Sequence, residues 1–128
     1  QRYPDIQLEL SVDDGMTDIV ASRFDAGVRI GESIAKDMVS LRIGGDERAA
    51  IVASPAYFER HPAPKTPQDL QRHRCIAYRH VTSGALYRWE LEKNGRELNV
   101  AVEAALVAND GDLMIAAALG GVGLAYVG

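Results

Sequence analysis

The chain has 128 residues, a formal net charge of −4 and a sequence pI near 5.3. That length suits one domain or part of a larger one, because a domain holds roughly 150 residues. The 47% hydrophobic and 25% charged fractions exclude a disordered, collagen-like, coiled-coil or disulfide-rich chain. The negative charge argues against binding nucleic acid by charge alone. No apolar run reaches the ~20 residues that span a bilayer, so we expect no membrane segment and a cytoplasmic protein.

Residues 6–12 alternate apolar and polar side chains, which predicts a half-buried strand. Asp13 and Asp14 follow as helix N-caps, and the next apolar residues predict a helix of at most about three turns. Residues 26–30 predict a second short strand, ended by Gly31. Strand, helix and strand in one run predict a βαβ unit, and therefore a parallel sheet.

Residues 39–43 and 49–53 predict two further strands, separated by a glycine-rich turn. Ser54-Pro55 and Thr66-Pro67 each place an N-cap before a proline at the first helical position, so each predicts a helix. Asp69 follows Thr66 at the spacing of a capping box.

Residues 75–78 predict a buried strand, and residues 79–84 a polar loop. Asn94-Gly95 between two alternating apolar segments is the strongest short-range signal for a β-hairpin. In that hairpin we expect Trp89 and Leu91 to face the apolar residues of the second strand.

Residues 109–112 predict the cap of a helix that Gly120-Gly121 ends, and residues 122–127 predict the next strand. The chain is therefore expected to be α/β, with two lobes at residues 1–48 and 49–128. Charge differs between them: the first lobe has 6 Lys+Arg and 10 Asp+Glu, whereas the second has 8 of each.

Motifs for catalysis or metal binding are weak. Residues 31–35 lack one glycine of the G-x-S-x-G nucleophile elbow. The spacing His73-x-Cys75 alone does not make a metal site. Residues 109–112 resemble the start of a calcium loop but have a glycine where a bidentate Glu is required. We therefore expect no catalytic residue, no metal and no cofactor.

Ligands of parallel α/β lobes collect outside the carboxyl ends of the strands. Helix N-termini after Asp13 and Asn109 would offer backbone N–H groups there, which favours an anionic or carbonyl-bearing ligand. We interpret the basic stretch from Arg60 to Arg79 as a solvent-exposed helix surface. The alternative is a patch that binds phosphate or a partner.

Five strings lie in register along nearly all of the chain: RYPD at 2–5, FDAGVRIG at 24–31, ASPAYF at 53–58, TPQDLQRHRCI at 66–76, and VANDG at 107–111 leading into AAALGGVG at 116–123. Together they resemble the effector-binding domain of LysR-type transcriptional regulators. Gly27 stands where the family motif usually has Ala, a change that concerns packing alone.

The resemblance implies a two-lobed type 2 periplasmic-binding-protein-like fold with Rossmann-like subdomains and a small effector in the cleft. It also implies a dimer or tetramer that binds DNA through a separate N-terminal winged helix-turn-helix, which this chain lacks. By the same resemblance we expect truncation at both ends. Residues 1–48 would be part of the first subdomain, without its first strand and most of its first helix. Residues 49–128 would be the second subdomain, without the return strand and helix that follow it.

The resemblance carries six effector-binding candidates over to this chain, each of which also has a simpler role as a cap, a turn or a surface charge. The expected effector is a small molecule, with a carboxylate favoured by the helix N-termini. A solute-binding protein of a transporter is the main alternative, and a small α/β enzyme is a third class that lacks a convergent site. The candidates are Asp13, Arg29, Gly31, Arg79, His80 and Asn109.

Overall fold

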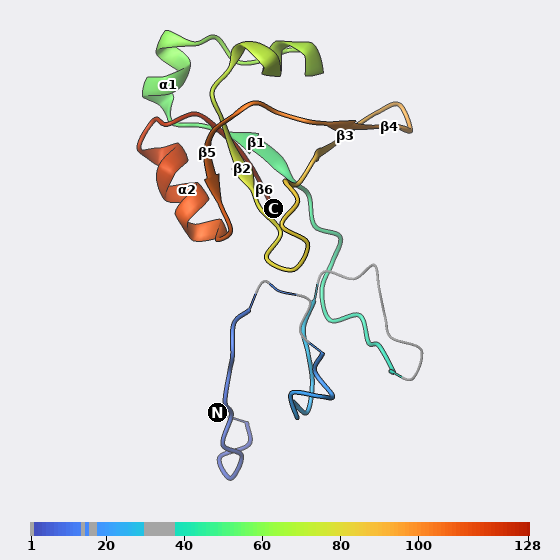
Figure 1. Cartoon of the computed structure of the whole chain (residues 1–128). Coiled ribbons are helices and arrows are strands. Elements are labelled where there is room, and N and C mark those ends of the chain that lie inside the picture. The colour runs from blue at the N-terminus through green and yellow to red at the C-terminus, as the bar shows by residue number, and fades with distance from the viewer. Residues whose placement is uncertain (1, 14, 16–17, 30–37) are drawn as a thin grey trace.

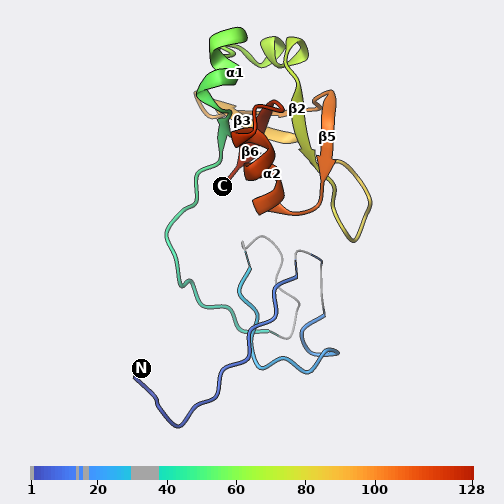
Figure 2. The same ribbon diagram turned by 90° about the vertical axis from the view of Figure 1, so that its left-hand side faces the viewer.

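A computed structural model describes residues 2–13, 15, 18–29 and 38–128 of the chain (Figure 1). Every helix and strand in this described part begins at or after Ala50. Together they form one α/β lobe. Most of the earlier described residues lie below it in both views, and the segment that leads into β1 runs up beside it (Figures 1 and 2). In chain order the elements are β1 (Ala50–Val52), α1 (Pro55–Arg60), the 3-10 helix η1 (Pro67–Arg72), β2 (Cys75–Tyr78), β3 (Trp89–Lys93), β4 (Arg96–Val100), β5 (Ala104–Ala108), α2 (Gly111–Leu119) and β6 (Leu124–Val127).

Four strands form the main sheet in the order β1-β6-β2-β5. β2 runs parallel to both of its neighbours, β5 and β6, while β1 is antiparallel to β6. A connection between parallel strands must cross over a face of the sheet, and α2 makes this connection from β5 to β6. α2 contacts β2, β5 and β6, so it covers one face of the sheet.

Strand β2 supplies a side chain to the core on each face of the sheet. Successive strand residues point to opposite faces, and both Cys75 and Ile76 are fully buried. This burial on two sides explains why β2 is apolar throughout, as parallel strands usually are. The core on the α1 side contains Tyr57, Leu70, Cys75, Trp89 and Leu124, and the core on the α2 side contains Ile76, Ala108, Met114, Ala118 and Ala125.

The predicted hairpin is confirmed. β3 and β4 pair with Trp89 opposite Val100 and Leu91 opposite Leu98. Its two turn residues have left-handed backbones, with φ of 54° at Asn94 and 72° at Gly95. These angles are what a two-residue turn needs to match the twist of the strands.

The predicted helix starts at Ser54 and Thr66 are confirmed. The Ser54 hydroxyl oxygen accepts from the Tyr57 N–H at 3.2 Å. Asp69 Oδ2 accepts from the backbone N–H of Thr66 at 2.9 Å and of Lys65 at 3.1 Å, and these bonds hold the pKa of the Asp69 carboxyl below its usual value. The second helix is of the 3-10 type.

The N-cap of helix α2 lies within the predicted run 109–112 but one residue after Asn109. Asp110, not Asn109, is the N-cap, because its Oδ1 accepts from the Leu113 N–H at 2.7 Å. The predicted glycine stop is confirmed, since Gly121 has φ of +79° and the Val122 N–H donates back to the Ala117 carbonyl at 3.1 Å. Strand β5 ends just before Asn109, where the carboxyl end of a strand was expected, although its bounds were not predicted.

The strands predicted before residue 49 are wrong for the described residues. Residues 6–12, 26–29 and 39–43 form no strand, because no second strand lies beside them in the described part of the chain. Without that partner their apolar side chains stay exposed, from 59% at Ile6 to 94% at Val12. The predicted βαβ unit is therefore not formed by these residues.

The short helix predicted after Asp13 is also wrong for the described residues, because residues 19–23 are in a turn. Asp18 Oδ1 accepts from the N–H of Val20 and of Ala21, both at 3.0 Å, and starts a single turn. Arg23 ends this turn with a φ of 59°. The predicted cap residue Asp14 lies outside the described residues.

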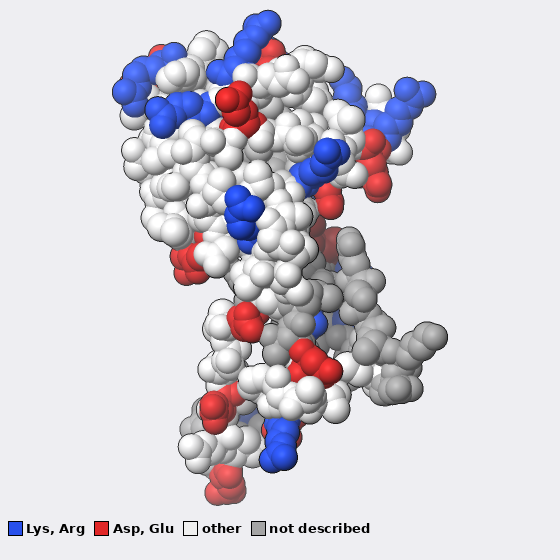
Figure 3. All heavy atoms as spheres, in the orientation of Figure 1, with Lys and Arg blue, Asp and Glu red and all other residues white. Residues whose placement is uncertain are grey.

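Figure 3 shows basic groups concentrated at the α1 and η1 end of the lobe and acidic groups below it, in line with the charge counted along the sequence.

Gly123 allows β6 to start against Arg74, the residue directly before β2. The Leu124 N–H donates to the Arg74 carbonyl at 2.8 Å, and a Cβ on Gly123 would collide with that same carbonyl. We expect Gly123→Ala to lower the free energy of unfolding by about 1–3 kcal/mol, because backbone must move to admit the methyl group. Urea denaturation followed by circular dichroism measures this change.

Gly111→Ala is the matched control for that variant. Gly111 is the first residue of α2, and no atom lies within 4 Å of its ideal Cβ position. Its substitution should leave stability unchanged or raise it by up to ~1 kcal/mol. Equal stability of the two variants would contradict the close approach at Gly123.

Cys75 is the chain's single cysteine and is fully buried. Burial raises the pKa of its thiol to about 11, so the reactive thiolate is disfavoured in the folded protein. We expect negligible alkylation by iodoacetamide at pH 8 in the native state and rapid alkylation in denaturant. Mass spectrometry measures the extent of alkylation in both states. Alkylation of the native protein at the rate of a free thiol would contradict the prediction.

Candidate functional site

The carboxyl ends of β2 and β5 lie side by side. The two strands are parallel neighbours, and the Arg79 N–H donates to the Ala108 carbonyl at 2.7 Å where they end. Arg79 and His80 leave β2 at this edge, and Asn109 leaves β5. The sheet register therefore brings together three of the six predicted site residues.

These residues line a hollow of about 300 Å³, which we call the β2–β5 hollow. Arg79 is its permanent cation, and no Asp or Glu is among the described residues that line it. An anion in this hollow would therefore meet a positive charge without an opposing carboxylate. The lining residues are Arg79, His80, Val81, Gly84, Val107, Ala108 and Asn109.

A short loop positions the guanidinium of Arg79. Arg79 Nη1 donates to the Gly84 carbonyl at 2.7 Å, and the His80 N–H donates to the Ala85 carbonyl at 2.9 Å. Gly84 has φ of +70°, a left-handed conformation that side chains rarely adopt. One nitrogen of the guanidinium is thus held by the loop, and an arginine has further N–H donors.

His80 lies between two aromatic rings. Its ring centroid is 5.6 Å from that of Tyr78 and 5.6 Å from that of Tyr87, both in edge-to-face arrangements. The Tyr87 N–H donates to the Tyr78 carbonyl at 2.8 Å, so the two tyrosines are themselves fixed together. His80 is exposed but has a defined place at the rim of the hollow.

Asn109 lies at the rim of the hollow and is not a helix cap. Because the Asp110 carboxylate takes the Leu113 N–H, that donor of α2 is already bonded. The expected contribution of α2 to ligand binding through free N–H groups is reduced accordingly. The exposed Asn109 side chain offers a donor and an acceptor instead.

The other three candidates do not line this hollow. Asp13 is exposed before the lobe, and its Oδ1 accepts from the Gly15 N–H at 2.8 Å. Arg29 is also exposed in the segment before the lobe. Gly31 lies outside the described residues. The described residues after Asp13 do not form the predicted helix, since residues 19–23 are in a turn.

Four residues of the hollow were not among the candidates: Val81, Gly84, Val107 and Ala108. Val81 and Gly84 belong to the loop that follows β2, and the other two are the last residues of β5. The sequence indicated the loop after β2 and the end of a strand before Asn109, but not which β5 side chains line the hollow. The apolar side chains of Val81 and Val107 add a surface for the body of a ligand.

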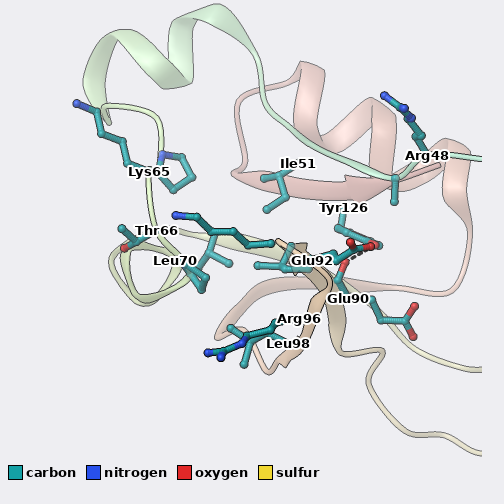
Figure 4. Close-up of a pocket in the computed structure, with 15 residues that line it drawn as sticks. Arg48, Ile51, Lys65, Thr66, Leu70, Glu90, Glu92, Arg96, Leu98 and Tyr126 are labelled. Atoms are coloured by element: carbon teal, nitrogen blue, oxygen red, sulfur yellow. Dashed lines mark hydrogen bonds between the residues drawn. The ribbon is translucent and has the colours of Figure 1, made fainter.

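A second and larger hollow of about 850 Å³ lies beside the β3–β4 hairpin (Figure 4). Its lining combines apolar groups such as Ile51 and Leu70 with charges of both signs, including Lys65 and Glu92. The Tyr126 hydroxyl donates to the Glu90 carbonyl at 2.8 Å and fastens the hairpin to β6. Burial and the Glu90 charge raise the pKa of Tyr126. Sequence patterns gave no signal for this hollow, because its walls come from four separate segments of the chain.

The described residues contain no group of three or more side chains that could hold a metal ion. In the described part of the chain, no helix has the length and apolar character needed to cross a membrane.

Comparison with known proteins gives matches along the whole chain. The family model of the LysR substrate binding domain matches residues 1–128. The transcriptional regulator PgrR of Escherichia coli K12 is 46% identical over 125 residues, which are 98% of this chain and 42% of PgrR. The regulator CrgA of Neisseria meningitidis has a TM-score of 0.81 at 24% identity, covering 98% of this chain and 42% of CrgA.

The regulatory domain of CrgA alone has a TM-score of 0.78 at 25% identity, covering 98% of this chain and 60% of that one. These LysR regulators have the two-lobed type 2 periplasmic-binding-protein-like α/β fold, so the predicted fold class is confirmed. The relatives named here are transcriptional regulators and give no support to the transporter alternative. The chain spans about two fifths of the length of PgrR. It belongs to the LysR substrate-binding domain family.

Proposed function

We propose that this chain is the effector-sensing part of a cytoplasmic LysR-type transcriptional regulator. A small molecule binds in the β2–β5 hollow and thereby modulates transcription by the whole protein. The observation that carries this proposal is the convergence of Arg79, His80 and Asn109 at the carboxyl ends of two parallel strands. Ligands of open α/β sheets bind at this edge. The role is sensing and not catalysis.

The effector we propose is a small organic carboxylate with an apolar body. Arg79 keeps N–H donors beyond the one bonded to Gly84, and arginine binds carboxylates in a planar, bidentate manner. Asn109 supplies a neutral polar contact, and Val81 and Val107 supply the apolar surface. A neutral amide analogue would lose the charge-assisted bond to the guanidinium.

We further propose that residues 1–48 and 49–128 belong to different subdomains of the regulator. The described helices and strands all begin at or after Ala50, which supports this boundary. Asp13, Arg29 and Gly31 would then contribute to the effector site from the first subdomain, as the family resemblance suggests. DNA binding belongs to a separate domain of the whole protein.

The carboxylate hypothesis is tested by Arg79→Ala. Calorimetric titration of the whole regulator with a panel of small carboxylates and their amide analogues identifies a ligand. The substitution should weaken carboxylate binding roughly ten- to hundredfold, the loss expected for one charge-assisted hydrogen bond of about 1.5–3 kcal/mol.

Two control variants accompany that measurement. Arg88→Ala removes an exposed arginine that does not line the β2–β5 hollow and should leave binding unchanged. Arg79→Lys keeps the charge without the planar fork and should restore part of the affinity. Tighter binding of the amides, or unchanged binding by Arg79→Ala, would reject the carboxylate hypothesis.

The separation of sensing from DNA binding gives its own prediction. The 128-residue chain has a net charge of −4, so we expect no preference for a promoter fragment over random DNA. Fluorescence anisotropy at moderate salt measures both affinities. Sub-micromolar binding to one promoter by this chain alone would place DNA contacts in the sensing part and contradict the prediction.

A further inference from the structure

A row of aromatic rings connects the β2–β5 hollow to the β3–β4 hairpin. His80 lies at the rim of the hollow, and its ring meets that of Tyr87 edge to face with centroids 5.6 Å apart. The Tyr87 ring is 5.9 Å from that of Tyr126, and Tyr126 stacks on Trp89 at 5.8 Å. These separations lie in the range at which aromatic side chains attract each other. We call these four residues, His80, Tyr87, Tyr126 and Trp89, the aromatic row.

The far end of the aromatic row holds the hairpin. Trp89 is the first residue of β3 and is only 1% exposed. Its stacking partner Tyr126 lies on β6, and the Tyr126 hydroxyl donates to the Glu90 carbonyl at 2.8 Å (Figure 4). The hairpin projects from the lobe in Figure 1, and most of β4 is exposed. A displacement of the Tyr126 ring would therefore be passed to β3 and change the position of this projecting element.

The near end of the row is fixed to the loop that follows β2. The Tyr87 N–H donates to the Tyr78 carbonyl, and the Gly84 N–H donates to the His80 carbonyl, both at 2.8 Å. Arg79 Nη1 donates to the Gly84 carbonyl at 2.7 Å. Backbone hydrogen bonds thus close the loop from both ends, and the guanidinium of the hollow is bonded to its tip. A change at Gly84 is carried through these bonds to the backbone of Tyr87.

We propose that the loop of residues 79–87 and the aromatic row couple occupancy of the β2–β5 hollow to the position of the β3–β4 hairpin. The trigger rests on the proposed function: a ligand that engages the Arg79 guanidinium competes with the Gly84 carbonyl for its N–H groups. The loop then shifts Tyr87 against Tyr126, and the hairpin follows. Close-packed rings transmit such a shift because one ring cannot move unless its neighbours adjust. The hairpin thereby reports the state of the hollow at the surface of the lobe.

The coupling is tested on the 128-residue chain without any ligand. Arg79→Ala removes the bond to Gly84, as a competing ligand would. Hydrogen–deuterium exchange of residues 89–100, measured by mass spectrometry, reports opening of the hairpin backbone. Acrylamide quenching of tryptophan fluorescence reports on Trp89 alone, because the chain has one tryptophan. We expect Arg79→Ala to raise the exchange rate and the quenching constant roughly two- to tenfold.

Substitution of Tyr87 tests whether the aromatic row carries the effect. Tyr87→Leu interrupts the row and should by itself raise both quantities. Adding Arg79→Ala to Tyr87→Leu should then cause no further rise, because the path between loop and hairpin is already broken. Tyr87→Phe keeps the ring and should preserve the full response to Arg79→Ala.

Arg60→Ala is the matched control. Arg60 is also an exposed arginine whose guanidinium is bonded to a backbone carbonyl, since its Nε donates to the Ala56 carbonyl at 3.2 Å. It belongs to α1 and has no ring of the aromatic row beside it in sequence. This variant should leave the hairpin exchange and the Trp89 quenching unchanged. Thermal melting by circular dichroism establishes that each variant is folded.

Three results would overturn the proposal. Folded Arg79→Ala could leave both quantities of the hairpin unchanged. The effects of Arg79→Ala and Tyr87→Leu could multiply independently, which would show that they do not share a path. Arg60→Ala could raise both quantities equally, which would mean a general loosening of the lobe. Each of these results leaves the binding measurements on the whole regulator unaffected, so failure of the coupling and failure of the carboxylate hypothesis are distinguishable.

Discussion

Burial of β2 on both faces of the sheet is the constraint on which the rest of the lobe depends. Cys75 and Ile76 are adjacent in sequence, yet each is fully buried in a different core. A strand in this position cannot carry a polar side chain on either face without losing hydrogen bonds to water. It must also pair on both edges, and β5 and β6 provide those partners.

The candidate site follows from the same strand. Because β2 and β5 are parallel, the residues after both strands emerge at one edge, and polar side chains become possible where the cores end. Arg79 and Asn109 are far apart in sequence but line one hollow for this reason. The loop bond from Arg79 to Gly84 then orients the guanidinium. Strand β2 thus contributes side chains to both cores, and the candidate ligand-binding residues follow its carboxyl end.

In two places, backbone groups or apolar side chains lack a neighbouring strand in the described part of the chain. Residues 6–12 have a strand pattern without a strand beside them in the described part, and β5 has one open edge there. In both cases the residues are suited to a contact that the described lobe does not make. The hairpin shows the contrast, because β3 and β4 pair with each other and Tyr126 fastens them to β6.

The sequence by itself determined the elements that depend on near neighbours in the chain. Asn94-Gly95 predicted the hairpin, Ser54 and Thr66 predicted two helix starts, and residues 75–78 predicted β2, because turns, caps and short buried strands are governed by local chemistry. The family resemblance, carried by five strings in register, predicted the fold class and three residues of the hollow.

Only the tertiary structure decided the rest. The alternation of residues 6–12 predicted a strand, but a strand forms only where another strand pairs with it. The sequence of the segment does not determine whether such a partner is present. The choice of Asp110 over Asn109 as the cap of α2 depended on which carbonyl-bearing side chain reached the Leu113 N–H. Likewise, the exposure of Ile115 and Leu119 on α2 became apparent only when the sheet was in place, because burial is a property of the assembled layers and not of the helix alone.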